Sequence, residues 1–215
     1  MRPDASVHFT VPGCGITLSA ADEVVTYVAR NLEPYRGFPT FMRCLPEVLK
    51  RRPGARILIV GGDSTSYGRA LPNGQTYRQK MLDELGDSLD TSRVHFLGKV
   101  PYASFLAILQ ISSAHVYLTY PFVLSWSMME AMAAGCVLVA SRTAPVTEMI
   151  CDGENGVLVD FFSPPQVANA VVEVLANPQD HAALRANARR LIVEQFDLKR
   201  ICLPAQLNLV ERLTR

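Results

Sequence analysis

The sequence carries little net charge and no long apolar run. Its formal net charge is +1 at neutral pH, and 19% of its residues are charged. This balance creates no overall field that would attract a nucleic-acid backbone or an anionic membrane, so any anion site must be a local cluster. The longest strongly apolar run, around Ala131–Ala140, is well short of the roughly 20 residues that a membrane-spanning helix needs. We therefore expect no nucleic-acid partner and no transmembrane segment.

Sorting signals and disulfide patterns are also missing. Residues 1–20 contain no positively charged segment followed by an apolar block, so we expect no signal peptide. The cysteines are odd in number and form no Cys-x-x-Cys pair, which is typical of free thiols in a reducing compartment. They are Cys14, Cys44, Cys136, Cys151 and Cys202. We expect a cytoplasmic protein, with peripheral attachment to the inner face of a membrane left open for a longer chain.

Several catalytic signatures are absent too. No histidine has a metal-ligand partner three or four residues away. Gly61-Gly62 lacks the rest of the dinucleotide fingerprint G-x-G-x-x-G, and no phosphate-binding G-x-x-x-x-G-K-[ST] loop occurs. The order of residues suggests no Ser-His-Asp or Cys-His pairing. NAD-dependent chemistry is therefore disfavoured, and we expect neither a metal nor a resident cofactor.

What the sequence does contain is a regular alternation of strands and helices. The segment RILIVG is almost wholly apolar, as in strands that parallel sheets bury on both faces. Strands are expected at Glu23–Ala29, Arg56–Gly61, Val94–Leu97, His115–Thr119, Cys136–Ala140 and Gly156–Val159. Helices are expected at Phe38–Lys50, around Tyr77–Leu85, at Ala103–Leu109 and Ser127–Ala134, and in three C-terminal segments that open near Ser163, Asp180 and Leu198.

This alternation predicts an α/β fold with a Rossmann-like, doubly wound parallel sheet. We assign residues 21–215 to this domain, with its C-terminal helices, and residues 1–20 to a linker or an edge strand. The polar stretch Asp63–Gly74 is too long for an ordinary strand-to-helix loop and is expected to be an insertion or flap. In such sheets, ligands bind at the carboxyl ends of the strands, where the strand order reverses.

A local pair of cations follows the first strand expected in that domain. Arg30 comes directly after Glu23–Ala29, and Arg36-Gly37 follows beside the N-terminus of the next helix. Two guanidinium groups in one strand-end loop form an anion site, which the helix dipole strengthens. Gly37 would allow the backbone to approach a ligand closely. The alternative, two solvated surface arginines, is equally compatible with the spacing.

The segment SWSMMEAMAAG, residues 125–135, adds polar groups at the same edge of the sheet. It follows a strand directly, so the first amides of its helix are available to a phosphate or a sugar hydroxyl. Glu130 is the only charge in this otherwise apolar helix, and its carboxylate can accept from two ribose hydroxyls. Alternatively, Ser127-Met-Met-Glu130 matches a capping box, in which Glu130 bonds back to the cap.

The order of these segments resembles a known family. Arg30, Arg36-Gly37, RILIVGG, VHFLGKV, EAMAAGCVLVAS and APVTEMICDGENGVLV together resemble the C-terminal domain of family 4 retaining glycosyltransferases, over roughly residues 24–175. The resemblance implies the two-domain GT-B architecture, with this chain as the donor-binding half and an N-terminal Rossmann-like acceptor domain missing. It implies metal-independent transfer from a nucleoside-diphosphate sugar to a saccharide, lipid or small-molecule acceptor, with retention of the anomeric configuration.

The resemblance also implies roles for single residues. Arg30 looks like the family's arginine and Arg36 occupies its lysine position, both on the donor diphosphate. Val100 and its neighbours would contact the nucleobase through backbone groups. Glu130 looks like the second glutamate of the family's Glu-x7-Glu motif, which holds the ribose, and the amides of residues 123–127 would face the phosphate and the sugar. The full set of donor-site candidates is Arg30, Arg36, Gly37, Gly62, Val100, Ser125, Trp126, Ser127 and Glu130.

One position departs from the family pattern. The first glutamate of the motif should lie eight residues before Glu130, where the chain has Phe122. In relatives that carboxylate contacts hydroxyls of the donor sugar, and a charged acceptor typically contributes about 1.5–3 kcal/mol. With the acceptor domain missing, we expect this chain alone to be inactive. Two alternatives remain: a non-catalytic module that binds a nucleotide or a partner protein, and half of a sugar-nucleotide epimerase.

Overall fold

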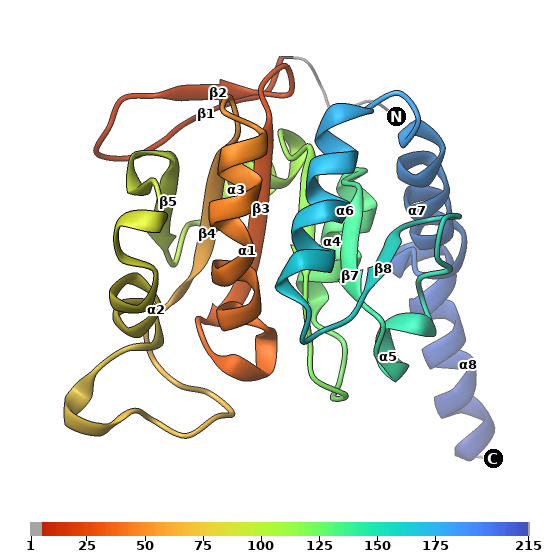
Figure 1. Ribbon diagram of the computed structural model, residues 1–215. Helices are drawn as coiled ribbons and strands as arrows, with labels where there is room; N and C mark the ends of the chain where they lie inside the picture. Colours follow the sequence, from red (N-terminus) through yellow and green to blue (C-terminus); the bar gives the residue numbers. More distant parts are fainter. Residues whose placement is uncertain (1–5, 215) are drawn as a thin grey trace.

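The computed structural model describes residues 6–214 and contains one six-stranded parallel sheet between layers of helices (Figure 1). The strand order is β5-β4-β3-β6-β7-β8, and every neighbouring pair is parallel. The strands are β3 (Val24–Asn31), β4 (Arg56–Gly62), β5 (Val94–Gly98), β6 (Ala114–Tyr117), β7 (Leu138–Ser141) and β8 (Val157–Val159). The Rossmann-like sheet predicted from the sequence is confirmed.

Helices cover both faces of the sheet. The α-helices are α1 (Phe38–Arg51), α2 (Tyr77–Leu85), α3 (Tyr102–Gln110), α4 (Trp126–Ala134), α5 (Ala144–Thr147), α6 (Pro164–Ala176), α7 (Ala182–Gln195) and α8 (Leu203–Leu213). On one face α1 packs against α2 and α6, and on the other α4 packs against α3 and α7. The first helix continues through Pro46 without a break.

The alternation of side chains along β4 explains how one strand packs against the helices on both faces of the sheet. Ile57 and Ile59 lie in the core beneath α1 and α6, whereas Leu58 and Val60 lie in the core on the opposite face. Successive side chains of a strand point to opposite faces, so an apolar run is needed where both faces are covered. The expectation of two-sided burial for RILIVG is therefore confirmed.

The N-terminal segment adopts a structure that the sequence did not indicate. Strands β1 (His8–Thr10) and β2 (Thr17–Ser19) pair in antiparallel fashion and form a small sheet of their own. Phe9 of this hairpin packs with Ile108 and Ile111 at the end of α3. The segment that we expected to be a linker or an edge strand of the main sheet is thus a hairpin that covers α3. Residues 1–5 of that segment lie outside the described part of the chain.

The C-terminal end also differs from expectation. Instead of one helix opening near Leu198, a π-helical turn (Leu198–Cys202) leads into α8, which extends away from the body of the molecule (Figure 1). No residue of α8 is buried. Within residues 6–214, no helix is both long and apolar enough to cross a membrane.

Candidate functional site

Two loops meet where the order of the sheet reverses, between β3 and β6. The loop after β3 contains a 3-10 turn (Pro34–Arg36), and the loop after β6 leads to α4. The amide of Tyr120 donates to the carbonyl of Tyr35 over 2.8 Å, and the rings of these two tyrosines pack edge-to-face with centroids 5.2 Å apart. Segments more than 80 residues apart in sequence therefore form one surface at the carboxyl ends of the strands. This is where an open α/β sheet is expected to bind a ligand.

Arg36 lies at the centre of this surface and is held by both loops. Its Nη1 donates to the hydroxyl of Thr119 over 2.8 Å and to the carbonyl of Val123 over 3.3 Å. Its Cζ lies 5.5 Å from the ring centroid of Tyr67 and 5.8 Å from that of Phe122. The alternative of two solvated surface arginines therefore does not fit Arg36, because bonds and aromatic contacts hold its guanidinium, whereas Arg30 is exposed.

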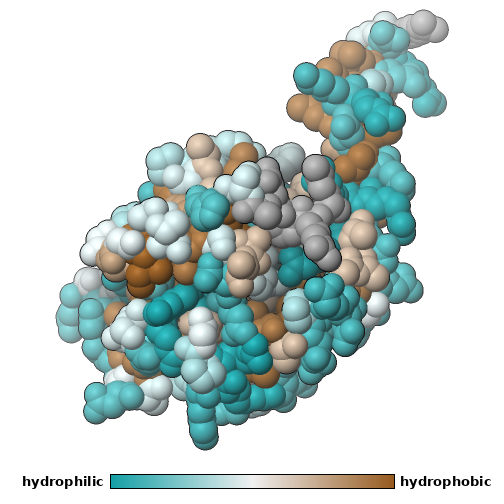
Figure 2. Space-filling view, turned by 90° about the horizontal axis from the view of Figure 1, so that it is seen from above, coloured by the Kyte–Doolittle hydropathy of each residue, from teal (hydrophilic) through white to brown (hydrophobic). Residues whose placement is uncertain are grey.

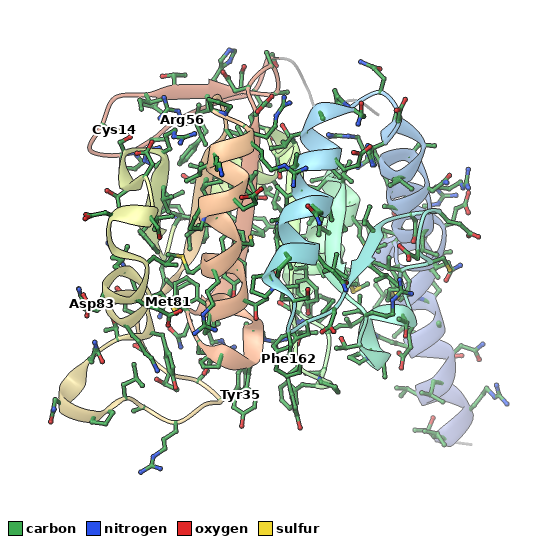
Figure 3. All side chains as sticks on the ribbon, viewed as in Figure 1. Cys14, Tyr35, Arg56, Met81, Asp83 and Phe162 are labelled. Carbon is green, nitrogen blue, oxygen red and sulfur yellow. The ribbon has the colours of Figure 1, made fainter. Side chains whose placement is uncertain are left out.

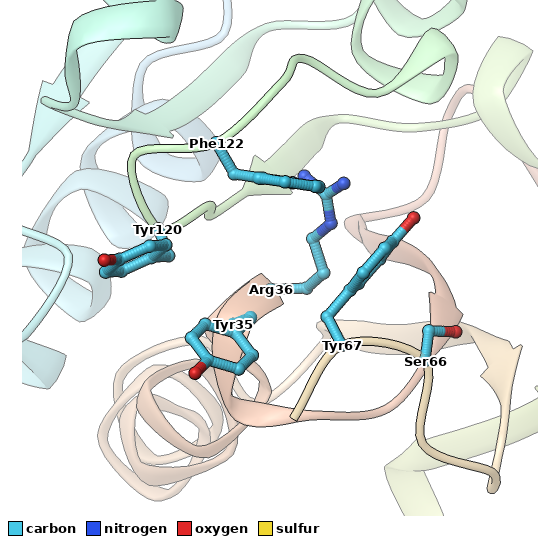
Figure 4. Close-up of a pocket in the computed structure, with 6 residues that line it drawn as sticks. All are labelled: Tyr35, Arg36, Ser66, Tyr67, Tyr120 and Phe122. Atoms are coloured by element: carbon cyan, nitrogen blue, oxygen red, sulfur yellow. The ribbon is translucent and has the colours of Figure 1, made fainter. Parts of the chain in front are cut away.

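These side chains line a cavity of about 400 Å³, which we call the aromatic pocket (Figure 4). Its lining residues are Tyr35, Arg36, Ser66, Tyr67, Tyr120 and Phe122. The lining side chains thus include one cation, the serine hydroxyl and four aromatic rings, three of them tyrosines with a phenolic hydroxyl, and no carboxylate. Phe122, at the position where the family pattern has a glutamate, is one of these rings.

Arg30 lies in a second hollow of about 420 Å³, the Arg30 pocket. It is lined by Ala29, Arg30, Val60, Gly61, Lys99, Val100, Tyr102 and Phe105. The structure thus brings Arg30 and Val100 together, as the sequence analysis predicted, and adds a second cation, Lys99. It does not place Arg30 and Arg36 in one pocket, since they line separate hollows along the same edge of the sheet.

Glu130 is hydrogen-bonded to Tyr102, one of the residues that line the Arg30 pocket. The hydroxyl of Tyr102 donates to Glu130 Oε1 over 3.0 Å, and this bond to a carboxylate raises the pKa of the Tyr102 phenol. The capping-box interpretation of Glu130 is wrong, because α4 begins one residue earlier than expected. Ser125 is its N-cap and accepts from the amide of Ser127, which lies inside the helix.

The amides at the start of α4 are less free than expected. The amide of Ser125 donates to the hydroxyl of Tyr117 over 2.8 Å, and the amide of Ser127 donates to Ser125 Oγ over 3.3 Å. Trp126 lies between them with 81% of its surface exposed. Two of the amides that were expected to face a ligand, those of Ser125 and Ser127, therefore already donate to side chains of the protein.

The two candidate glycines are positions of close packing. Gly37 has φ of 69°, and a Cβ there would lie 2.3 Å from Leu118 Cβ. A Cβ on Gly62 would lie 2.7 Å from Asn31 Oδ1 and 3.1 Å from Lys99 Cε. Both glycines let neighbouring elements approach closely at the edge of the sheet, and neither lines the aromatic pocket or the Arg30 pocket.

The residues that hold the polar loop 63–74, the segment expected to be a flap, were not among the predicted site residues. Glu33 is fully buried, and its Oε2 accepts from the amides of Ser66, Tyr67 and Gly68 over 3.2, 3.0 and 2.9 Å. Asn31 donates from Nδ2 to the hydroxyl of Ser66 over 2.6 Å. The only signal in the sequence was a single carboxylate between a leucine and a proline in the Arg30–Arg36 loop.

The histidines do not enlarge the site. His115 is fully buried with Nδ1 2.8 Å from the hydroxyl of Thr26, and burial lowers its pKa to about 3. Burial also lowers the pKa of His95. No group of three or more potential metal ligands occurs within the described residues.

The comparison with protein families decides the class of this molecule. The model of the family described as glycosyl transferases group 1 matches residues 16–191. The chain belongs to the glycosyl transferases group 1 family. The match includes both pockets, all nine candidate residues and the hairpin strand β2.

Curated relatives of this group 1 glycosyltransferase chain are more than twice as long as their matched part. The D-inositol 3-phosphate glycosyltransferase of Corynebacterium efficiens is 30% identical over 201 residues, which cover 87% of the chain and 45% of the relative. An uncharacterized glycosyltransferase of Methanocaldococcus jannaschii is 29% identical over 171 residues, which cover 79% and 41%. The chain therefore spans less than half the length of the relatives it matches.

Solved structures share the fold of this group 1 domain. Anabaena HepE in complex with UDP and glucose superposes with a TM-score of 0.74 at 21% identity, over 91% of this chain and 49% of that one. The C-terminal domain of a group 1 glycosyl transferase from Francisella tularensis superposes with a TM-score of 0.69 at 18% identity, over 82% and 87%. At these identities the likeness shows a common architecture, the GT-B type of Rossmann-like domain.

Proposed function

We propose that this chain is the donor-binding, C-terminal domain of a family 4 retaining glycosyltransferase and that it binds a nucleoside-diphosphate sugar at the β3–β6 edge. The observation that carries the proposal is the Arg30 pocket. There, two cations, Arg30 and Lys99, lie beside the Val100 backbone, and Tyr102 links the pocket to the carboxylate of Glu130. Positive charge beside a hydroxyl-binding carboxylate fits a phosphorylated nucleoside.

Each part of such a donor has a matching group along this edge. Val100 would contact the base, and Glu130 would accept from the ribose hydroxyls. A carboxylate has about four acceptor positions, so Glu130 can keep its bond from Tyr102 while it binds the ribose. The diphosphate would lie between the Arg30 pocket and Arg36, which leaves the aromatic pocket for the sugar. HepE, a protein of the same fold, is described with UDP and glucose, which makes UDP a suitable first probe.

The cations would also serve the reaction. When the glycosidic bond breaks, negative charge develops on the leaving diphosphate, and preorganised donors stabilise that charge more in the transition state than in the ground state. Arg36 is preorganised in this sense by Thr119 and Val123. The acceptor, which we propose to be a saccharide, a lipid or a small molecule, would bind to an N-terminal domain that completes the enzyme. This chain alone would then bind donor without transferring it.

The proposal is tested by calorimetric titration of this chain with UDP. We expect binding in the micromolar to millimolar range. Arg30→Ala should weaken it about 10- to 100-fold, since hydrogen bonds to a charged group contribute about 1.5–3 kcal/mol. Arg190→Ala is the matched control, because Arg190 lies on α7 and bonds only locally, to Asn187. Absence of UDP binding at millimolar concentration would overturn the donor-site assignment.

One observation favours a second candidate, a non-catalytic nucleotide-binding module. Phe122 places an aromatic ring in a pocket without a carboxylate, so hydroxyls of a sugar would meet no charged acceptor there. The two candidates share UDP binding and differ in turnover. Release of free nucleotide from a nucleotide-sugar by the full-length protein, in the presence of acceptor, supports the transferase; binding without any turnover supports the module.

A further inference from the structure

We propose that Tyr67 and Phe122 are positioning residues for Arg36, and that they fix its guanidinium so that it binds the second phosphate of the donor, the one next to the sugar. The identity of this anion rests on the proposed function. The buried carboxylate of Glu33 completes the arrangement, because it holds the loop that carries Tyr67. We call Arg36, Tyr67 and Phe122 the Arg36 cluster.

The three side chains of the Arg36 cluster contact one another pairwise. The Cζ of Arg36 lies 5.5 Å from the Tyr67 centroid and 5.8 Å from the Phe122 centroid, and the two rings are 5.2 Å apart (Figure 4). Both distances are within the range in which a guanidinium is attracted to the face of an aromatic ring. Tyr67 comes from the loop after β4 and Phe122 from the loop after β6, so the two contacts orient the guanidinium from separate elements.

Arg36 retains donors for a ligand in this orientation. Its bonds to Thr119 and Val123 both leave from Nη1, and a guanidinium has five N–H donors. The aromatic pocket that it faces contains no carboxylate to compete for those donors. Because Arg36 and Arg30 line different hollows, and Val100 and Tyr102 line that of Arg30, we place Arg30 at the phosphate next to the nucleoside and Arg36 at the other.

Glu33 explains why the polar loop stays against the site. Its carboxylate accepts from three consecutive amides, those of residues 66–68, and is itself 0% exposed. Three convergent N–H groups that donate to one oxygen fix the backbone on both sides of Tyr67. The other oxygen, Oε1, is buried without a hydrogen-bond partner among the described residues. A buried oxygen without a partner costs free energy, so its presence calls for an explanation. The loop that Glu33 holds contributes one ring, Tyr67, to the aromatic pocket.

The test compares UDP with UMP on Tyr67 variants of this chain. Tyr67→Leu removes the ring, and we expect UDP binding to weaken about five- to tenfold with little change for UMP, which lacks the second phosphate. Tyr67→Phe retains the ring and should bind both ligands as the unchanged protein does. Phe162→Leu is the control, because Phe162 is an exposed aromatic residue, 79% accessible, outside the Arg36 cluster.

A loss that affects UMP and UDP equally would overturn the inference, as would no loss at all. If Tyr67 only stabilised the folded structure, its removal would weaken the binding of UDP and UMP by the same factor. The ratio of the two affinities therefore distinguishes a structural role from a role in positioning Arg36. If the unchanged protein binds no UDP, the proposed function itself fails. If it binds UDP and Tyr67→Leu leaves the ratio of affinities unchanged, only this inference fails.

A second variant gives a readout without ligand. Glu33→Gln keeps the shape of the side chain but replaces the charged acceptor with a weaker neutral one. We expect the amides of residues 66–68 to exchange hydrogen faster by about tenfold or more, while amides of the β4 core keep their rates. Selective loss of UDP over UMP affinity should accompany this change. Unaltered exchange at residues 66–68 would show that Glu33 does not hold the loop.

Discussion

Gly37 has two independent reasons to lack a side chain. Its φ of 69° lies in the left-handed region, and a Cβ would lie 2.3 Å from Leu118 Cβ, an atom that cannot rotate away. The left-handed conformation costs a non-glycine residue about 1–2 kcal/mol, and overpacking a core costs about 1–3 kcal/mol more. We expect Gly37→Ala to lower the free energy of unfolding in urea by about 2–5 kcal/mol.

Gly74 provides the matched control for this substitution. Its φ is 70°, but nothing lies within 4 Å of the position that a Cβ would occupy. Gly74→Ala should therefore cost only the backbone part, about 1–2 kcal/mol. Equal losses of stability for the two variants would show that the close approach of Gly37 to Leu118 contributes nothing.

Some residues of the candidate site could be predicted from the sequence and others could not. Arg30, Val100 and Glu130 were identified because they lie in ordered segments that resemble a family, and the structure places all three around one hollow. Glu33 and Tyr67 could not be identified, since their contacts join positions 33–35 residues apart in sequence. Such pairings depend on how a loop folds back, and no local periodicity encodes that.

At the scale of elements, α4 offers a direct test of its cap. The hydroxyl of Ser125 accepts from the amide of Ser127, and loss of an N-cap hydroxyl typically costs about 1 kcal/mol. We expect Ser125→Ala to lower the free energy of unfolding by about this amount. Ser163→Ala, which removes the cap of α6, should do the same.

The two cap variants should differ in ligand binding. Ser125 lies next to the loop that carries Phe122, whereas Ser163 begins a helix that covers one face of the sheet. UDP affinity measured by titration should therefore fall for Ser125→Ala and stay constant for Ser163→Ala. A fall for both would mean that the effect follows general stability and not the position of α4.

Most elements of the sheet were predictable because burial imposes a period on the sequence. The apolar strand RILIVG and the helical spacing after Phe38 correspond to β4 and α1. The hairpin β1–β2 was not predicted, because each of its three-residue strands has only one buried side chain, whereas β8, also of three residues, has two adjacent ones. Neither α5, which has four residues, nor the π-helical turn before α8 was predicted. Their conformations depend on tertiary contacts.

At the scale of the whole molecule, α8 is the element least tied to the domain. It contains no buried residue, and its apolar side chains project into solvent, as Figure 2 shows for the arm that leaves the body. Leu207, Leu209, Val210 and Leu213 are 55–77% exposed. We expect deletion from Leu203 onward to change the free energy of unfolding by less than about 1 kcal/mol.

The deletion should also reduce self-association, measured by sedimentation velocity, because it removes exposed apolar surface. A variant ending after Gln195 extends the comparison to the π-helical turn, which packs against α7. A large drop in stability on deletion of α8 alone would show that the helix packs against the body in solution.

A further hollow, of about 570 Å³, is lined by Arg142 and Phe162 and shares Tyr120 with the aromatic pocket. Tyr35 and Phe162 accordingly lie at the same end of the molecule (Figure 3). The central strand β3 supports this end from both sides, pairing with β4 and with β6. The first partner begins 25 residues after Asn31, whereas the second begins 83 residues after it.

This separation has a consequence for the order of assembly. During synthesis, β3, β4 and β5 can pair as soon as they have emerged, but one edge of β3 stays open until β6 is made. Pairings distant in sequence form slowly and leave unpaired strand edges exposed to aggregation. The aromatic pocket, which we propose for the sugar, therefore forms only when β6 docks, whereas the residues that line the Arg30 pocket all precede residue 114. A chain stalled before that residue would contain Arg36 without Thr119 and Phe122, which hold its guanidinium.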